Sequence, residues 1–421
     1  MSAASIPVPF RDALRFWSML GWISFGGPAG QIGILERELV ARRRWLSAED
    51  FQHGLSLAAV LPGPEALKLV IYAGWRLHGM RGGVIAGLGF ILPAVFILLG
   101  LSFVYVWFGA LPAVQYVLAG LAAVVIAMIG QALLRLAPQV LSRAWLIALA
   151  AGALLAFSIM RVPFIVVLVA ALIVGTAVAW RQFRAEDAVL GRLHALAGIP
   201  IRQTWRLLAI SALCWLIPAA ALDIAVSKDS RIFDLYLAIS RIAIVSFGGA
   251  YPALAYANAE FVGNLGWLSP QQAAAGLALA ETTPGPLVIV LQFFGFMAAW
   301  NGPAPLPAPA AAVLGALASS YALFMPSFAL MLLAAPFLHV LRRDARIAAA
   351  MRAITAVTLV AIVDIGWRFA AAVLWHNGAP QWPVVCIAVA AFVMLRFTRI
   401  AAGWLVLSGA VAGLASGMLL A

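Results

Sequence analysis

The sequence has 421 residues, of which 65% are hydrophobic and only 10% charged, and its mean hydropathy is +1.04. Ordinary soluble domains carry about one quarter charged residues, so this composition excludes a soluble protein and predicts a helical protein of the lipid bilayer. The formal net charge of +12 comes from Lys and Arg in loops between apolar runs, which reports membrane topology rather than nucleic-acid binding. The two cysteines and five histidines show no metal-ligand spacing, so neither a metal nor another cofactor is expected.

The apolar runs predict an all-α, polytopic membrane protein in which ordinary spans alternate with broken elements. Ordinary spans are expected at Gly82–Phe108, Pro112–Leu134, Ala144–Met160, Pro163–Trp180, Leu207–Ala225, Ala311–Leu338, Ile347–Trp375, Trp382–Leu395 and Ala401–Leu420. Broken or re-entrant elements are expected at Phe10–Gly27, Ala48–Leu77, Phe233–Gly249 and Pro270–Trp300. We divide the chain into a first repeat at 1–206, a linker helix and loop at 207–232 that inverts the second half, and a second repeat at 233–421.

The division of the chain into two halves rests on an internal repeat. Ser24–Pro64 aligns without gaps onto Ser246–Pro286, at an offset of 222 residues, with sixteen of the 41 aligned positions identical. The shared residues include Ser-Phe-Gly-Gly, one glutamate, Trp-Leu-Ser and Pro-Gly-Pro. Gene duplication explains this pattern, and duplicated halves are common among secondary transporters.

Basic residues in matching loops predict that the two halves have opposite orientations. The first half carries Arg37 and Arg42–Arg44 after its Phe-Gly-Gly motif, whereas Tyr251–Ser269 carries no Lys or Arg. Cytoplasmic loops are enriched in these residues, so the first loop is assigned to the cytoplasm and its counterpart to the periplasm. The same rule makes the N-terminus cytoplasmic and the C-terminus periplasmic. Both flanks of Ala48–Leu77 are basic, so this segment is predicted to enter and return as a hairpin.

The two Pro-Gly-Pro motifs, at Pro62, Gly63 and Pro64 and at Pro284, Gly285 and Pro286, are predicted to interrupt helices. Proline removes a backbone donor and glycine relaxes the helix, so backbone groups there become free at membrane depth. Helices that begin at Glu65 and Leu287 would then direct their positive N-terminal ends at an anion. The alternative is that both motifs are structural kinks.

The Phe-Gly-Gly motifs are the second pair of candidate sites. They comprise Phe25, Gly26 and Gly27, followed by Pro28, and Phe247, Gly248 and Gly249. Glycines allow unusual torsions and a close approach of the backbone to a ligand. Close packing of helices through small residues is the alternative interpretation.

Ionisable and hydroxyl side chains inside the apolar segments are few, so each is a functional hypothesis. Lys68 follows the first Pro-Gly-Pro by one helical turn and would attract an anion, unless it reaches out to the membrane interface. Thr282 and Thr283 would donate hydroxyls to an oxyanion, or else satisfy carbonyls freed by the next proline. A proton-coupled mechanism needs a carboxylate that changes charge, and the candidates are Glu38, Glu65, Glu260 and Glu281. For Glu38 alone, pairing with nearby arginines is the simpler interpretation. Arg241 and Asp364 also fall in predicted helices, without repeat partners.

These motifs, FGGPAGQIGILERELVARRRWLS, LPGPEALKLVIYAGW, SFGGAYPALAYANAEFVGNLGWLS and ETTPGPLVIVLQFFGF, resemble the long-chain, two-domain members of the chromate ion transporter family. The resemblance covers most of the chain. It implies chromate export across the bacterial inner membrane, chromate resistance, and energy from the proton motive force. It points to the Phe-Gly-Gly and Pro-Gly-Pro residues as the binding site, although Ala250 replaces the proline that follows the first Phe-Gly-Gly.

Alternatives to chromate export remain open at the level of sequence. Sulfate or another small anion would fit the same features, and a channel is an alternative to a carrier. An enzyme is not expected, because no acid, base and metal residues converge in the pattern. A homodimer is compatible with the predicted architecture.

Overall fold

A computed structural model describes residues 8–25, 27–160, 162–182, 201–225, 230–247, 250–303, 305–337, 345–376, 379–398, 400 and 402–420. This part of the chain is almost entirely helical, which confirms the prediction of an all-α membrane protein. Its only strands are β1 (Trp375–His376) and β2 (Ala379–Pro380), an antiparallel pair at a turn in which Trp375 lies opposite Pro380.

The first half and the linker contain α1 (Phe10–Ile23), α2 (Gly27–Glu36), η1 (Arg37–Arg42), α3 (Ala48–Val60), α4 (Glu65–Phe108), α5 (Pro112–Val140), α6 (Ala144–Ser158), α7 (Phe164–Gln182) and α9 (Ile201–Ala225). The second half contains α10 (Arg231–Val245), α11 (Ala250–Asn258), η2 (Ala259–Asn264), α12 (Pro270–Thr282), η3 (Leu287–Ile289), α13 (Val290–Asn301), α14 (Ala308–Ala334), η4 (Ala335–Phe337), α16 (Ala345–Leu374), α17 (Trp382–Phe397) and α18 (Ala402–Leu420).

Five helices in the described residues are long and apolar enough to cross a bilayer by length and composition: α4, α5, α9, α14 and α16. Three predicted ordinary spans, Gly82–Phe108, Pro112–Leu134 and Leu207–Ala225, lie within α4, α5 and α9. The predictions Ala311–Leu338 and Ile347–Trp375 overlap α14 and α16 but run past their last residues, Ala334 and Leu374. The other four predicted spans fall on shorter apolar helices, α6, α7, α17 and α18. The described chain is therefore that of a multi-pass membrane protein.

The helix α4 is two helices joined by a sharp turn. His78 and Gly79 have non-helical torsions, with φ of +61° at Gly79, where glycine avoids the steric cost of a side chain. Gly74 and Gly82 face each other so closely that a Cβ on either residue would overlap the backbone of the other. In a straight helix these residues would be about 12 Å apart, so the chain folds back at the turn. The short segment from Glu65 to Leu77 is thus a separate returning helix, packed against the long span after it.

The second half builds the same arrangement from two separate helices, α13 and α14. Gly295 and Gly315 stand between them, and a Cβ at Gly315 would come 2.7 Å from the carbonyl oxygen of Gly295. Small residues at these positions allow the two backbones to approach closely. Each Pro-Gly-Pro motif is therefore followed by a short helix that packs antiparallel to the next span.

The boundaries of the shorter elements also repeat at the offset of 222 residues. The helix α3 corresponds residue for residue to α12, and the π-helical segment η1 corresponds to η2. The shared Trp-Leu-Ser triplet explains the start of α3 and α12. The Oγ atoms of Ser47 and Ser269 accept hydrogen bonds from the amides of Asp50 and Gln272, at 3.0 and 3.1 Å. A serine that caps a helix in this way stabilises its first turn.

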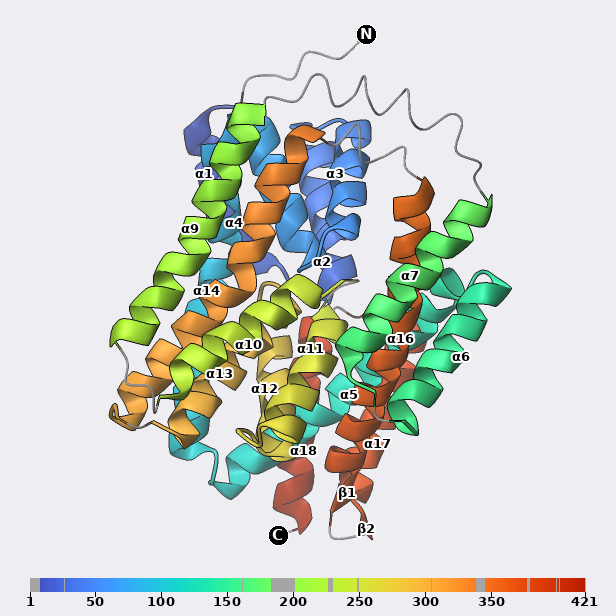
Figure 1. The fold of residues 1–421 in the computed structure, drawn as a ribbon. Coiled ribbons are helices and arrows are strands. Elements are labelled where there is room, and N and C mark those ends of the chain that lie inside the picture. The colour runs from blue at the N-terminus through green and yellow to red at the C-terminus, as the bar shows by residue number, and fades with distance from the viewer. Residues whose placement is uncertain are drawn as a thin grey trace.

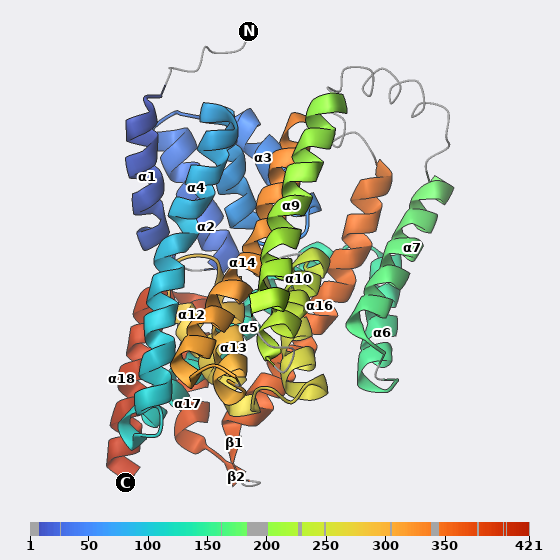
Figure 2. The same ribbon diagram turned by 60° about the vertical axis from the view of Figure 1, so that its left-hand side comes forward.

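Figures 1 and 2 place α1, α2 and α3 toward the end of the molecule where the N-terminus lies, and α10, α12 and α13 toward the opposite end, where α18 finishes. The helices α4, α13 and α14 pack against one another and belong to one apolar core. The helices α6, α7 and α16 form a second apolar cluster to one side. The linker helix α9 packs on α14 and α10 and exposes large apolar side chains such as Leu213 and Ile217.

Candidate functional site

The two Pro-Gly-Pro motifs form buried turns between helices. The helix α3 ends at Val60 and α4 begins at Glu65, while α12 ends at Thr282 and η3 begins at Leu287. Gly63 has a φ of +98° and Gly285 a φ of +105°, which are torsions that residues with a side chain rarely adopt. All six residues of the two turns are buried.

Each turn is hydrogen-bonded to the Phe-Gly-Gly region of the other half. The amide of Gly63 donates to the carbonyl of Ser246 at 2.7 Å, and the amide of Gly285 donates to the carbonyl of Ser24 at 2.8 Å. The two bonds join equivalent positions of the repeat in a reciprocal manner. They supply donors for the carbonyls at the ends of α1 and α10, which have no intrahelical partner.

The two glycines are also held by close packing against a span of the opposite half. A Cβ at Gly63 would overlap the hydroxyl of Ser327 on α14, and a Cβ at Gly285 would come 2.8 Å from the Cβ of Ala94 on α4. Because Leu92-Pro93 corresponds to Met325-Pro326 in the repeat, Ala94 and Ser327 are also equivalent residues. Torsion and packing therefore both require glycine at the centre of each turn.

We call the places where a Pro-Gly-Pro turn is hydrogen-bonded to the other half the Gly63 crossing and the Gly285 crossing. The side chain of Gln31 stabilises the Gly285 crossing. It is 1% exposed on α2, and its Nε2 donates to the carbonyls of Gly285 and Ser24. The equivalent residue in the second half is Ala253, which cannot make this bond. The repeat does not single out Gln31, because no glutamine stands at the matching position; a polar glutamine in an apolar run is the signal in the sequence that could have indicated it. Ser24 and Ser246 were also not among the predicted site residues, although the shared Ser-Phe-Gly-Gly motif contains them.

Lys68 lies at the other crossing and is fully buried. Its Nζ donates to the carbonyl of Leu61, the residue before the first turn. The alternative that Lys68 reaches out to the membrane interface is therefore wrong in this structure. Glu65, one helical turn earlier at the start of α4, is half-buried, so an ammonium and a carboxylate flank the turn together.

The hydroxyls of Thr282 and Thr283 both donate to the carbonyl of Leu279, at 2.7 and 2.9 Å. This carbonyl lacks a helical donor because the amide of Thr283 bonds to Ala280 instead. The second interpretation, that these threonines satisfy carbonyls loosened near Pro284, describes this structure.

The other carboxylate candidates have different partners. Glu38 forms ion pairs with Arg42 and Arg43, at 3.2 and 3.4 Å, in agreement with the simpler interpretation of this residue. Glu260 instead accepts a hydrogen bond from Asn264 at 2.8 Å. One oxygen of Glu281, Oε1, is buried with no hydrogen-bond partner in the described part of the chain.

The Phe-Gly-Gly residues are only partly within the described chain. Gly26, Gly248 and Gly249 lie outside the described residues. Phe25 is 39% exposed, whereas the carbonyl of Phe247 accepts a hydrogen bond from Thr358 at 3.4 Å. Gly27 has a φ of +68° at the start of α2, and the backbone of Pro28 continues that helix.

Of the two charged residues without repeat partners, Asp364 pairs with Arg368 at 2.9 Å, and Arg241 is exposed on α10.

Comparisons with known proteins agree on one family. A family profile described as chromate transporter matches residues 11–176 and 233–414. The chromate transport protein of Pseudomonas aeruginosa is 34% identical over 331 residues, which cover 78% of this chain and 72% of that protein. The chromate transport protein of Cupriavidus metallidurans is 26% identical over 410 residues, or 96% of this chain and 92% of that one. An uncharacterized transporter of Methanocaldococcus jannaschii is 25% identical over 358 residues, or 85% and 83%. No solved structure gives a significant match.

Proposed function

This chain belongs to the chromate transporter family, and from that premise we propose that it is a secondary active transporter that exports chromate across the bacterial inner membrane. Members of this family are transporters and not enzymes. The proposed substrate is a tetrahedral dianion, and the proposed energy source is the proton motive force. A site shared by two halves that move against each other would give alternating access to the two membrane faces.

The observation that carries this proposal is the reciprocal pair of hydrogen bonds from Gly63 to Ser246 and from Gly285 to Ser24. Both bonds lie at helix breaks, and both connect one half to the other. When one half moves against the other, these two contacts must change together, because they occupy equivalent positions of the repeat. A binding site at this crossing would therefore open to one face as it closes to the other.

We further propose that the halves are inverted repeats, with the linker around α9 reversing the second half. Two observations support this. The basic residues of the first half have no counterparts in the matching loops of the second. The helices α1, α2 and α3 also lie toward the opposite end of the molecule from α10, α12 and α13 (Figures 1 and 2).

The crossing has the chemistry that an oxyanion requires. Pro64 and Pro286 precede α4 and η3 and provide no side-chain cap, so the first amides of both helices remain available to a ligand. Helix N-termini bind tetrahedral anions through such amides and through the helix dipole. Lys68 adds a positive charge once its bond to Leu61 is exchanged for a bond to the anion. In the conformation described here the two turns are closely packed, so binding requires the halves to separate.

The test is uptake of labelled chromate into inverted membrane vesicles that contain the full chain. We expect saturable uptake that a protonophore abolishes and that excess sulfate reduces only partly. Complete competition by an equal concentration of sulfate would assign the protein to general oxyanion transport. Uptake that neither saturates nor responds to the protonophore would show a channel and overturn the proposal.

A further inference from the structure

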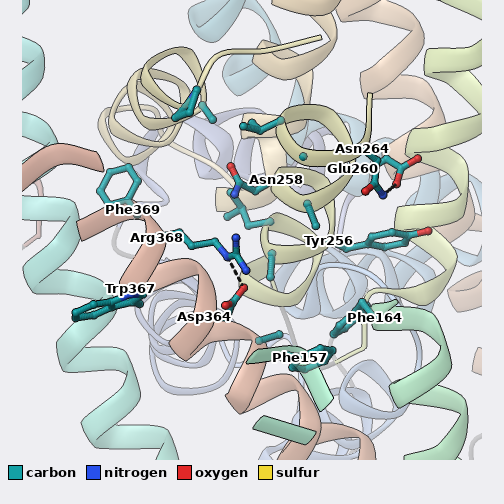
Figure 3. A pocket seen from close by; sticks show the side chains of 18 of the residues that line it. Phe157, Phe164, Tyr256, Asn258, Glu260, Asn264, Asp364, Trp367, Arg368 and Phe369 are labelled. Atoms are coloured by element: carbon teal, nitrogen blue, oxygen red, sulfur yellow. Dashed lines mark hydrogen bonds and ion pairs between the residues drawn. The ribbon is translucent and has the colours of Figure 1, made fainter. Parts of the chain in front are cut away.

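A cavity of about 890 Å³ lies between α7, α11, η2, α12 and α16. Figure 3 shows that its polar side chains come mainly from two sides: Tyr256, Asn258, Glu260 and Asn264 from α11 and η2, and Asp364 and Arg368 from α16. The turn before α7 also contributes to its wall. These segments adjoin loops that the distribution of Lys and Arg assigns to the periplasm, so the topology proposed above places the cavity on that side.

One wall of the cavity is formed by α12, the helix that also contains Glu281. Pro270, Ala273, Ala274 and Leu277 line the cavity and form one stripe of the helix. Glu281 follows Leu277 by one turn on the same stripe, about 6 Å farther along the helix axis. The lining of the cavity on α12 therefore ends one helical turn before a carboxyl group whose Oε1 is buried without a hydrogen-bond partner in the described chain.

The repeat shows that the fold does not need a carboxyl group at this place. The equivalent of Glu281 at the end of α3 is Ala59, and the two helices have matching lengths and matching serine caps. An unpaired carboxyl group inside a membrane protein is costly, and such groups mark ion and proton pathways. The presence of this carboxyl group in only one of the two halves indicates a function that the other half does not share.

Charged residues occur on only some of the elements that pack on α12, the helix of Glu281. Among the elements that pack on α12, the segments η3, α13 and α18 contain no charged residue. The helix α5 contains Arg135, α4 contains Glu65, Lys68, Arg76 and Arg81, and the described side chains of α16 include Arg352, Asp364 and Arg368. None of the ion pairs in the described chain includes Glu281. In the cavity itself, Asp364 and Arg368 form an ion pair with each other, and Glu260 accepts a hydrogen bond from Asn264.

We propose that this cavity is the proton entrance from the periplasmic face and that Glu281 is the group that binds and releases the coupled proton. This inference rests on the proposed function as a proton-driven transporter. A proton enters through the cavity and binds the carboxylate of Glu281, which becomes the neutral acid. The proton leaves toward the other face after the halves have moved. Glu281 precedes the second turn by only three residues, so its charge acts directly on the Gly285 crossing.

The experiment uses the full chain in proteoliposomes and separates two readouts. Exchange of labelled chromate at equal pH on both sides needs no net proton movement, whereas accumulation driven by an imposed pH gradient does. We expect E281Q to keep exchange within about twofold of the unmodified protein and to lose gradient-driven accumulation. E281D, which keeps a carboxyl group, should retain accumulation. The matched control is E49Q, an exposed glutamate on α3, which should behave like the unmodified protein in both readouts.

A second measurement tests the route independently of any change at Glu281. In a variant whose native cysteines, Cys214 and Cys386, are replaced by Ala, L277C should react from the periplasmic face with a membrane-impermeant thiol reagent. A278C, which is fully buried on another side of α12, should not react. Accumulation that persists in E281Q would overturn the role of Glu281, and an unreactive L277C would overturn the route. Absence of chromate exchange in the unmodified protein would instead remove the proposed function itself.

Discussion

The substitutions G63A and G285A test the crossing most severely, because each adds one methyl group at a point where torsion and packing both exclude it. Gly63 and Gly285 have φ values of +98° and +105°, and a side chain there costs about 1–2 kcal/mol. Overlap with Ser327 or Ala94 adds about 1–3 kcal/mol, the usual cost of overpacking. The free energy of the conformation with the crossing closed should therefore rise by about 2–5 kcal/mol. This rise lowers the population of that conformation about 30-fold to several thousandfold.

The assay is chromate uptake in vesicles together with thermal unfolding of the purified protein in detergent. Both variants should lose most transport and unfold at lower temperature. G100A provides the matched control, because Gly100 lies on α4 with nothing within 4 Å of an added Cβ. The packing part of the cost can be isolated with G63A/S327A, which removes the overlapping hydroxyl and leaves an ordinary 3.4 Å contact. This double variant should recover part of the stability but not all of it, since the torsional cost remains. Normal transport and stability in both single variants would refute the reasoning.

Four further substitutions test other contacts of the site and of the helices next to it. Replacing Lys68 by Gln should raise the half-saturation concentration for chromate several-fold, whereas R76Q on the exposed end of the same short helix should not; an unchanged value in K68Q would remove Lys68 from the site. Replacing Gln31 by Ala leaves a buried carbonyl of the second Pro-Gly-Pro turn with fewer partners and should cost about 1–3 kcal/mol of stability in denaturant unfolding. Replacing Ser47 or Ser269 by Ala should cost about 1 kcal/mol each in the same measurement, because both cap equivalent helices; a loss in only one of them would argue against equivalent roles.

Much of the helical framework could be predicted from the sequence because apolar runs of membrane length leave few alternatives. The predicted span Pro112–Leu134 lies within α5, and the predicted start of the returning helix, Glu65, is where α4 begins. The Pro-Gly-Pro motifs also mark the ends of helices, because proline cannot donate the next helical bond. These features depend on local chemistry, which the sequence displays directly.

The partners of the site residues could not be predicted, because they depend on how distant segments pack. Nothing in the sequence pairs Gly63 with Ser246, or Gln31 with the carbonyl of Gly285. Lys68 shows the same limit: its spacing from Pro64 suggested two environments, and only the fold shows that it bonds to Leu61. The sequence likewise allowed two partners for the hydroxyls of Thr282 and Thr283, an oxyanion or a main-chain carbonyl. Only the structure shows that both hydroxyls donate to the carbonyl of Leu279.

The central claim is that two inverted halves build one site. The most direct test is to measure from which membrane face each of two equivalent residues can be reached. Glu49 and Gln271 occupy matching positions on α3 and α12, and both are exposed. In a background without Cys214 and Cys386, E49C should react with a membrane-impermeant thiol reagent only in inverted vesicles. Q271C should react only in intact cells or right-side-out vesicles. Reaction of both cysteines from the same face would contradict the inverted arrangement and the shared site that depends on it.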